Sequence, residues 1–146
     1  MISLLYTTKE LSTAITYYDK VLAIDPQNID ALFGKGMNLY FLDKNDEAIT
    51  YYDKVLAIDP NDLSSLQNKA NALTFLGKYD EAITYYDKVL AIDPQNIDAL
   101  LNKGTALYDF GKYEEAVITF DKVLAIDPNN MIASSMKSDS TLQLDS

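Results

Sequence analysis

The feature that constrains this chain most is the segment Thr-Tyr-Tyr-Asp-Lys-Val-Leu-Ala-Ile-Asp-Pro, which occurs three times. The copies lie at Thr16–Pro26, Thr50–Pro60 and Thr84–Pro94, so each begins 34 residues after the last. A fourth, altered copy ends at Pro128. A fixed period of this length is typical of one supersecondary unit stacked on itself, each unit burying its apolar face against its neighbours.

Two helical patterns alternate in each unit, and we call them the first and the second helix. The first has apolar or small residues at i, i+4 and i+7, which is one face of an α-helix. Its middle member is always Gly or Ala, which predicts close packing, since Gly in a helix costs about 1 kcal/mol relative to Ala. The second has apolar residues at i, i+1, i+4, i+7 and i+8 and begins with acidic residues, which favour a helix N-terminus. The first-helix residues are Leu32, Gly36 and Leu39; Leu66, Ala70 and Leu73; and Leu100, Gly104 and Leu107. The second-helix residues are Ala48, Ile49, Tyr52, Val55 and Leu56; Ala82, Ile83, Tyr86, Val89 and Leu90; and Ala116, Val117, Phe120, Val123 and Leu124.

Turn signals separate these helices. Gly77 and Gly111 follow two of the first helices, where Gly can take the left-handed conformation that ends a helix. The second unit has Asp43 there, which can take that conformation at some cost. Asp-Pro closes each second helix, because proline disfavours the helical conformation in the preceding residue. The Asn and Asp residues after each proline predict caps for the next helix, so the sequence predicts an all-α chain of antiparallel helix pairs.

Composition excludes several classes of function. The 146 residues include no Cys and no His, so disulfides, thiol chemistry and the commonest metal ligand are excluded. All 12 basic residues are Lys, and the formal net charge of −10 opposes binding to nucleic acid. That charge favours either a basic partner or solubility alone. No apolar run reaches the roughly 18–20 residues of a membrane span, and the start is no signal peptide, so we expect a cytoplasmic protein that does not bind membranes.

Catalytic patterns are missing as well. The segment from Asp43 to Glu47 begins like a calcium-binding EF-hand loop, but Ala48 and Lys54 stand where that loop needs Gly and Glu. The acidic pairs recur at the same place in every unit, as a helix-start role predicts and a unique active site does not. The chain has no Gly-rich phosphate loop and no G-x-S-x-G motif. We therefore expect no enzyme, no cofactor and no bound metal.

The repeating residues resemble the tetratricopeptide repeat. The resemblance rests on the Gly or Ala of each first helix and on the Ala, the aromatic residue and the Pro that follow, and it spans nearly the whole chain. It implies a right-handed α-solenoid of antiparallel helix pairs with 34-residue repeats, forming a single domain over residues 1–146. The predicted parts are an incomplete first repeat at 1–28, consisting mainly of its second helix, repeats at 29–62, 63–96 and 97–130, and a degenerate capping helix with a polar tail at 131–146.

The sequence departs from the family before each small first-helix residue. Lys35, Lys69 and Lys103 stand there, where the family usually has Leu. A long lysine stem can lie along a packing surface while its ammonium group reaches water. We interpret these lysines as packing residues with solvated heads.

The N-terminal end raises two hypotheses. Leu5 and Tyr6 align with Leu39 and Tyr40, so residues 1–6 are expected to be only the tail of a first helix. The helix around Thr8–Ile24 would then lack most of its partner, although it repeats the internal sequence unchanged. Either the chain is a truncated or degenerate end of a longer array, or a second copy buries this face in a homodimer or larger assembly. The residues expected to self-associate are Ala14, Tyr18 and Val21.

The resemblance further implies that first helices line a concave face. The residues of this concave face vary between repeats, while the apolar stripes stay constant. Selection for a recognition surface would produce this pattern, and so would sequence drift. The residues expected to bind are Phe33, Met37, Tyr40, Phe41, Gln67, Asn71, Phe75, Leu101, Thr105 and Tyr108. Aromatic residues and Met favour interface centres, so we expect a scaffold for a protein or peptide with an apolar anchor and basic residues. A self-assembling structural repeat protein is the alternative.

One ligand of the resembled family fits poorly. Some members clamp the C-terminal carboxylate of chaperones with basic residues on the concave face. This chain has no Arg, and it has apolar, amide, hydroxyl or acidic side chains at those places, namely Phe33, Ser64, Gln67, Asp98 and Leu101. The sequence therefore argues against a chaperone tail of that type.

Overall fold

The computed structural model describes residues 7–146 and divides into two compact units, with unit 1 ending at Leu76 and unit 2 beginning at Gly77. Residues 1–6, for which the sequence predicts the tail of a first helix, lie outside the described residues. Between residues 7 and 146 the structure contains eight helices and no strands. The all-α prediction is confirmed.

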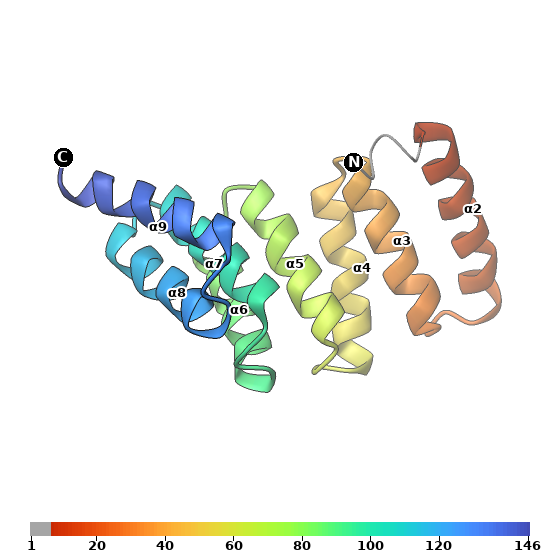
Figure 1. Ribbon diagram of the computed structural model, residues 1–146. Coiled ribbons are helices and arrows are strands. Elements are labelled where there is room, and N and C mark those ends of the chain that lie inside the picture. Colours follow the sequence, from red (N-terminus) through yellow and green to blue (C-terminus); the bar gives the residue numbers. More distant parts are fainter. Residues whose placement is uncertain (1–6) are drawn as a thin grey trace. The chain divides into compact units, whose positions relative to one another are not determined.

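Unit 1 contains four described helices, in which second and first helices alternate. They are α2 (Thr8–Ile24), α3 (Ile29–Phe41), α4 (Asn45–Ile58) and α5 (Leu63–Phe75). Each helix packs antiparallel against the next one along the chain, from α2 at the red end of the colour scale onward (Figure 1). This order places α3 between α2 and α4.

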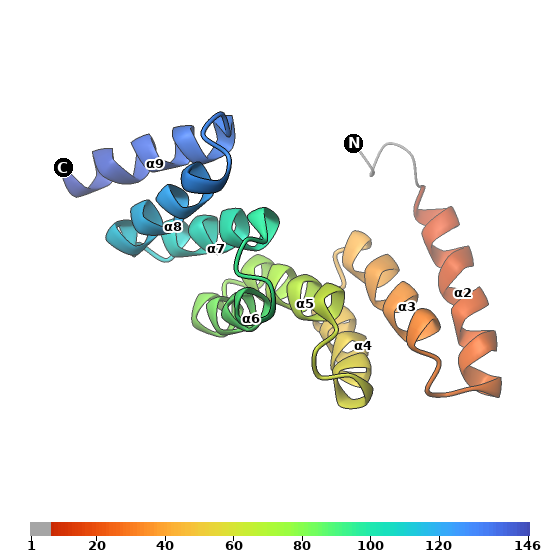
Figure 2. The same ribbon diagram turned by 60° about the horizontal axis from the view of Figure 1, so that its bottom comes forward.

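Unit 2 repeats the same arrangement with four more helices. They are α6 (Tyr79–Ile92), α7 (Ile97–Asp109), α8 (Tyr113–Ile126) and α9 (Met131–Leu144). Consecutive helices again pack together, and α9 also contacts α7 (Figure 2). The polar segment expected to follow the last helix is itself helical as far as Leu144. Its Ser140 is fully buried, and the Ser140 hydroxyl donates to the Met136 carbonyl at 2.7 Å, which lets a polar residue sit against α8.

The helix ends follow the predicted signals. The first helices are capped by Asn28, Asp62 and Asn96, and α9 by Asn130, each accepting a backbone N–H through its side chain. Gly77 and Gly111 have positive φ angles of 73° and 83°. Asp43 takes the same left-handed conformation, with φ 59°, although it carries a Cβ. That conformation costs a residue other than Gly about 1–2 kcal/mol, so the α3–α4 turn is strained in a way the later turns are not.

The predicted apolar stripes form the core. In unit 1, Leu39, Ala48 and Tyr52 form one buried cluster. In unit 2 the corresponding cluster contains Leu107, Ala116 and Phe120, together with Leu100, Val123 and Ala133. Close packing at the small first-helix residues is confirmed, because a Cβ on Gly36 would lie 2.7 Å from Tyr52 Cε1 and one on Gly104 would lie 2.5 Å from Phe120 Cε1. Both glycines therefore lie in close contact with the aromatic ring of the following helix, and a Cβ there would require that ring to shift.

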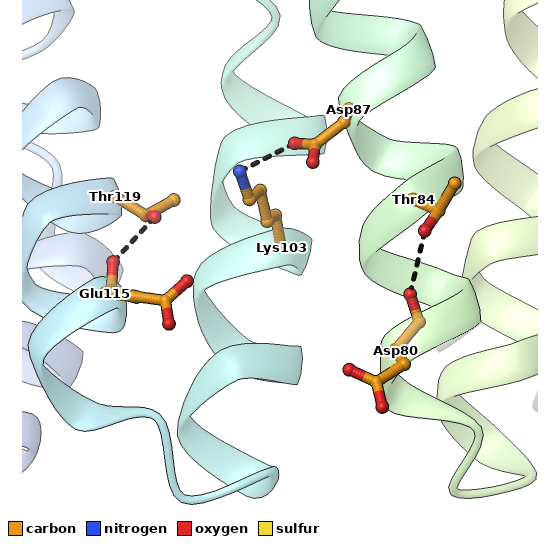
Figure 3. A network of polar contacts seen from close by, with 6 residues as sticks. All are labelled: Asp80, Thr84, Asp87, Lys103, Glu115 and Thr119. Carbon is orange, nitrogen blue, oxygen red and sulfur yellow. Dashed lines mark hydrogen bonds and ion pairs between the residues drawn. The ribbon is translucent and has the colours of Figure 1, made fainter.

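An ion pair links each second helix to the next first helix. Lys103 contacts Asp87 at 2.6 Å (Figure 3). Lys69 contacts Asp53 at 2.5 Å, and Lys35 pairs with Asp19 in the same way. The lysine stems do pack as expected, but their ammonium groups meet a carboxylate rather than water alone. The sequence signal for these pairs was an Asp sixteen residues before each Lys. Figure 3 also shows the hydroxyls of Thr84 and Thr119 donating to carbonyls of their own helices.

Candidate functional site

The predicted binding residues of α3 divide between the core and the surface. Phe33 is half-buried against the core, and its ring centroid lies 5.9 Å from that of Tyr52. Met37 is half-buried beside α2. Phe41, at the end of α3, keeps 38% of its surface exposed, and its ring meets that of Tyr40 edge-on at 5.7 Å. Phe41 is therefore available to a partner, whereas Phe33 also supports the fold.

Three of the predicted residues meet in a small pocket of unit 1. Tyr40, Phe41 and Phe75 line it together with Asp43 and Asn45, and its volume is about 150 Å³. We call this the aromatic pocket. The ring of Phe75 is 69% exposed and meets Tyr40 edge-on, with 5.7 Å between centroids. Burial raises the pKa of Tyr40, and the nearby Asp43 carboxylate raises it further.

Sequence reasoning did not identify Asp43 and Asn45 as site residues. Asn45 is 9% exposed, and its Oδ1 is buried without a hydrogen-bond partner. A signal existed, because the residues equivalent to Asn45 in the other repeats are Leu11, Tyr79 and Tyr113. A buried polar group is normally hydrogen-bonded, so an unpaired one calls for an explanation.

The other predicted binding residues lie on α5 and α7. Gln67 and Asn71 on α5 are half-buried, as are Leu101, Thr105 and Tyr108 on α7. The Thr105 hydroxyl donates to the Leu101 carbonyl of its own helix at 2.9 Å. Tyr108 packs against the core of unit 2, and its ring lies 5.3 Å from that of Tyr113. These α7 residues are thus partly engaged in contacts within unit 2.

A second hollow lies between α2 and α3, and we call it the α2/α3 groove. Its volume is about 380 Å³. Ala14 and Tyr18, predicted to self-associate, line it, while Val21 is half-buried and lies outside the lining. The remaining lining residues are Leu11, Gly34, Met37, Asn38 and Phe41. Sequence reasoning missed Leu11, Gly34 and Asn38, although Gly34 is unusual because the equivalent residues are Asn68 and Asn102.

Metal-ligand groups and membrane spans are not found in the described part of the chain. Between residues 7 and 146, no group of three or more acidic side chains is arranged to hold a metal ion. In the same part of the chain, no helix combines the length and apolarity required to cross a bilayer. What the two hollows offer is aromatic and apolar surface beside a few polar groups.

Comparison with known proteins identifies relatives of this architecture. Three sequence profiles described as "Tetratricopeptide repeat" match residues 3–28, 28–95 and 76–137. No curated protein matches the sequence. Among solved structures, MamA 41-end from Desulfovibrio magneticus RS-1 is similar over 93% of this chain and 77% of its own, at a TM-score of 0.88 and 21% identity.

Two RPAP3 structures are closer in sequence. The first TPR of Spaghetti (RPAP3), bound to the HSP90 peptide SRMEEVD, shares 30% identity over 84% of this chain and 97% of its own, with a TM-score of 0.77. The first TPR domain of human RPAP3 shares 28% identity over 82% and 94%, with a TM-score of 0.74. These matches confirm the predicted α-solenoid of antiparallel helix pairs. The chain belongs to the tetratricopeptide repeat family.

Proposed function

We propose that this chain is a protein-interaction scaffold that binds a peptide or protein segment in the concave groove expected for the family. The observation that carries the proposal is the exposed aromatic surface of Phe41 and Phe75 beside the half-buried amides of Gln67 and Asn71. Exposed rings supply binding energy at interface centres, and amides bond a peptide backbone. The peptide-bound relative at 30% identity supports this use of the fold.

The partner is a basic segment with an apolar anchor. The peptide of that relative carries acidic residues, as its sequence SRMEEVD states. This chain has a net charge of −10 and no Arg, so it repels an acidic peptide and attracts a basic one. Charge complementarity of this kind governs the rate and specificity of association more than the affinity.

A random peptide library displayed on phage tests the proposal. We expect enriched peptides to combine Lys or Arg with an apolar residue and to bind with affinities that fall as salt is raised. The double variant Phe41→Ala with Phe75→Ala should weaken a selected peptide at least about 10-fold, since exposed aromatic hot spots contribute about 2 kcal/mol or more. Ile118→Ala is the control, because Ile118 is also an exposed apolar residue, at 58%, but lies on the second helix α8. No enrichment, or equal losses in both variants, would refute the proposal.

The α2/α3 groove favours a second function, self-assembly. In unit 1 the internal second helix α4 has Ala48 and Tyr52 fully buried, with Leu39 of α3 in the same cluster. The equivalent Ala14 and Tyr18 of α2 are only half-buried. A second copy that laid a first helix or α9 in the groove would complete the packing that α3 gives α4. Each copy presents both kinds of surface, so such contacts form dimers or longer stacks.

Size-exclusion chromatography with light scattering, over a wide range of protein concentration, measures the molar mass and so tests self-assembly. We expect a mass above 16.3 kDa that Tyr18→Lys returns to the monomer. Tyr17→Lys is the matched control, because Tyr17 is the adjacent ring, 63% exposed, and does not line the groove. A monomer at every concentration, or the same response to both substitutions, would exclude self-assembly through this groove.

A further inference from the structure

The aromatic pocket concentrates the departures of the second repeat from the others. Its Asp43 replaces Gly77 and Gly111 of the later turns and holds their left-handed conformation. Its Asn45 replaces an apolar or aromatic residue and leaves a buried oxygen unpaired. Strained backbone and unsatisfied polar groups are expected mainly at functional sites, where a ligand resolves them. Both departures line the same pocket.

The fourth repeat, in unit 2, shows which side chains occupy the equivalent positions. There Tyr108 and Tyr113 occupy the positions of Tyr40 and Asn45, and their rings meet at 5.3 Å. The aromatic ring of Tyr113 thus contacts the ring of Tyr108 edge-on. In unit 1 the shorter Asn45 leaves the pocket beside Tyr40, with Phe41 and Phe75 completing its walls.

The charges around the pocket are those that a cation needs. The Asp43 carboxylate lines it, and Asp46 and Glu47 lie in the next turn, against one neighbouring cation, Lys44. The helices α3 and α5 both end at pocket residues, which brings their negative dipole ends to the pocket, and α4 begins there with its positive end. Aromatic faces attract ammonium groups within about 6 Å of the ring centroid. Asn45 Oδ1 is an acceptor in need of a donor.

The size of the pocket limits the occupant to one side chain. Small-molecule sites are usually about 300–1,000 Å³, and this pocket has about 150 Å³. We propose that the aromatic pocket binds the ammonium group of a lysine side chain from a bound peptide, with Asn45 and Asp43 accepting hydrogen bonds from it and Tyr40, Phe41 and Phe75 surrounding its stem. The assignment rests on the proposed peptide-binding function and names the residue that the pocket selects.

Three isosteric probes test the pocket directly by NMR on the full chain. They are n-butylammonium, neutral n-butanol and butyrate, titrated at constant ionic strength of about 0.15 M, where distant surface charges are largely screened. We expect n-butylammonium to shift the backbone amides of Asp43, Asn45 and Phe75 in a saturable way and to bind at least about 10-fold more tightly than butanol. Equally tight binding of butanol would show that the pocket is an apolar cavity that does not select for positive charge, and would overturn the assignment. Tighter binding of butyrate, or no saturation, would also overturn the assignment.

Variants separate the pocket from general charge effects. Asn45→Tyr restores the residue of the fourth repeat and should abolish n-butylammonium binding. Asp43→Asn keeps a residue tolerant of positive φ and should weaken binding about 3–10-fold. Asp139→Asn changes the net charge equally on exposed surface of α9 and should change nothing. If Asn45→Tyr fails to fold, Phe75→Ala serves instead, because its ring is largely exposed. A loss of binding common to Asp43→Asn and Asp139→Asn would refute a specific site.

The two proposals fail in distinguishable ways. The ion titration needs no peptide, so its result does not depend on whether the concave groove binds one. If the phage selection fails but n-butylammonium binding saturates, the peptide-scaffold proposal is refuted and the cation pocket is retained. Selected peptides that bind without Lys, together with equal binding of butanol, would remove the pocket and leave the scaffold.

Discussion

Adding one methyl group to two neighbouring glycines of α3 should change stability in opposite directions. Gly36 packs on Tyr52 of α4, and Gly34 packs on Tyr18 of α2. In both cases the new Cβ meets an aromatic ring too closely, so contact distance alone predicts two equally harmful substitutions. What differs is the freedom of the ring to move.

For Gly36→Ala the ring is fixed. The new Cβ would lie 2.7 Å from Tyr52 Cε1, whereas carbon atoms prefer about 3.5–4.0 Å. Tyr52 is fully buried within the cluster of Leu39 and Ala48, so the ring has no free space. Overpacking of this kind costs about 1–3 kcal/mol, against a gain of about 1 kcal/mol in helix propensity. The net effect should be a loss of roughly 0–2 kcal/mol.

For Gly34→Ala the ring can move away. Tyr18 is half-buried and borders the α2/α3 groove of about 380 Å³, and the atoms in conflict are at the far end of its side chain. The propensity term should therefore dominate, giving a gain of up to about 1 kcal/mol. Thermal unfolding followed by circular dichroism resolves the difference, since 1 kcal/mol shifts the midpoint by about 2–4 °C in a chain of this size. Equal midpoint shifts for the two variants would refute the argument from ring mobility.

Three further predictions concern the same region. Tyr52→Phe removes a buried hydroxyl without a partner and restores the ring type of Phe120, so urea unfolding should show a gain of about 1 kcal/mol; a loss would mean that the hydroxyl is satisfied. Asp43→Gly relieves the left-handed strain, and part of this gain is offset by the greater chain entropy of Gly in the unfolded state. The net free energy of unfolding should rise by about 0.5–1 kcal/mol in the same assay, and n-butylammonium binding should weaken. Burial raises the pKa of Tyr52 and of Tyr40. Burial lowers the pKa of Lys35, but the interactions of its ammonium group with Asp19 and Tyr51 together outweigh burial and raise that pKa. Groups with a raised folded pKa contribute stability that is complete below their ordinary value and is lost as pH rises past it, so unfolding should become easier above about pH 10, with a weaker dependence in Tyr52→Phe. A free energy of unfolding that stayed constant to pH 11 would contradict this sign.

The sequence predicted the scaffold well because its determinants are local and repeated. The residues equivalent to Gly36, Tyr52 and Pro60 recur at one period, so a pattern in one repeat was tested by the next. The caps at Asn28 and Asp62 and the strained turn at Asp43 followed from the same logic. Buried stripes needed no knowledge of tertiary structure, since the helical period alone gives their face.

The candidate site was harder to predict because it depends on exceptions. Periodicity explains what repeats share, whereas Asp43, Asn45 and Gly34 matter because each differs from its equivalents. Phe33 was grouped with Phe41 as a surface residue, yet its contact with Tyr52 depends on the rotation of α3 against α4. The Lys–Asp pairs were missed because each lysine was judged against its own helix rather than the preceding one.

Those pairs also bear on how such an array can change its length. Asp53 and Lys69 lie on opposite sides of a repeat boundary, sixteen residues apart, and so do the equivalent pairs. A gene rearrangement that removed or duplicated 34 consecutive residues of the repeat region would still place an aspartate sixteen residues before each remaining lysine of these pairs. The second helices of three repeats share an identical segment, so a whole-repeat change would leave that segment intact at each junction. The array can therefore lengthen or shorten by whole repeats while each new junction inherits its electrostatic link.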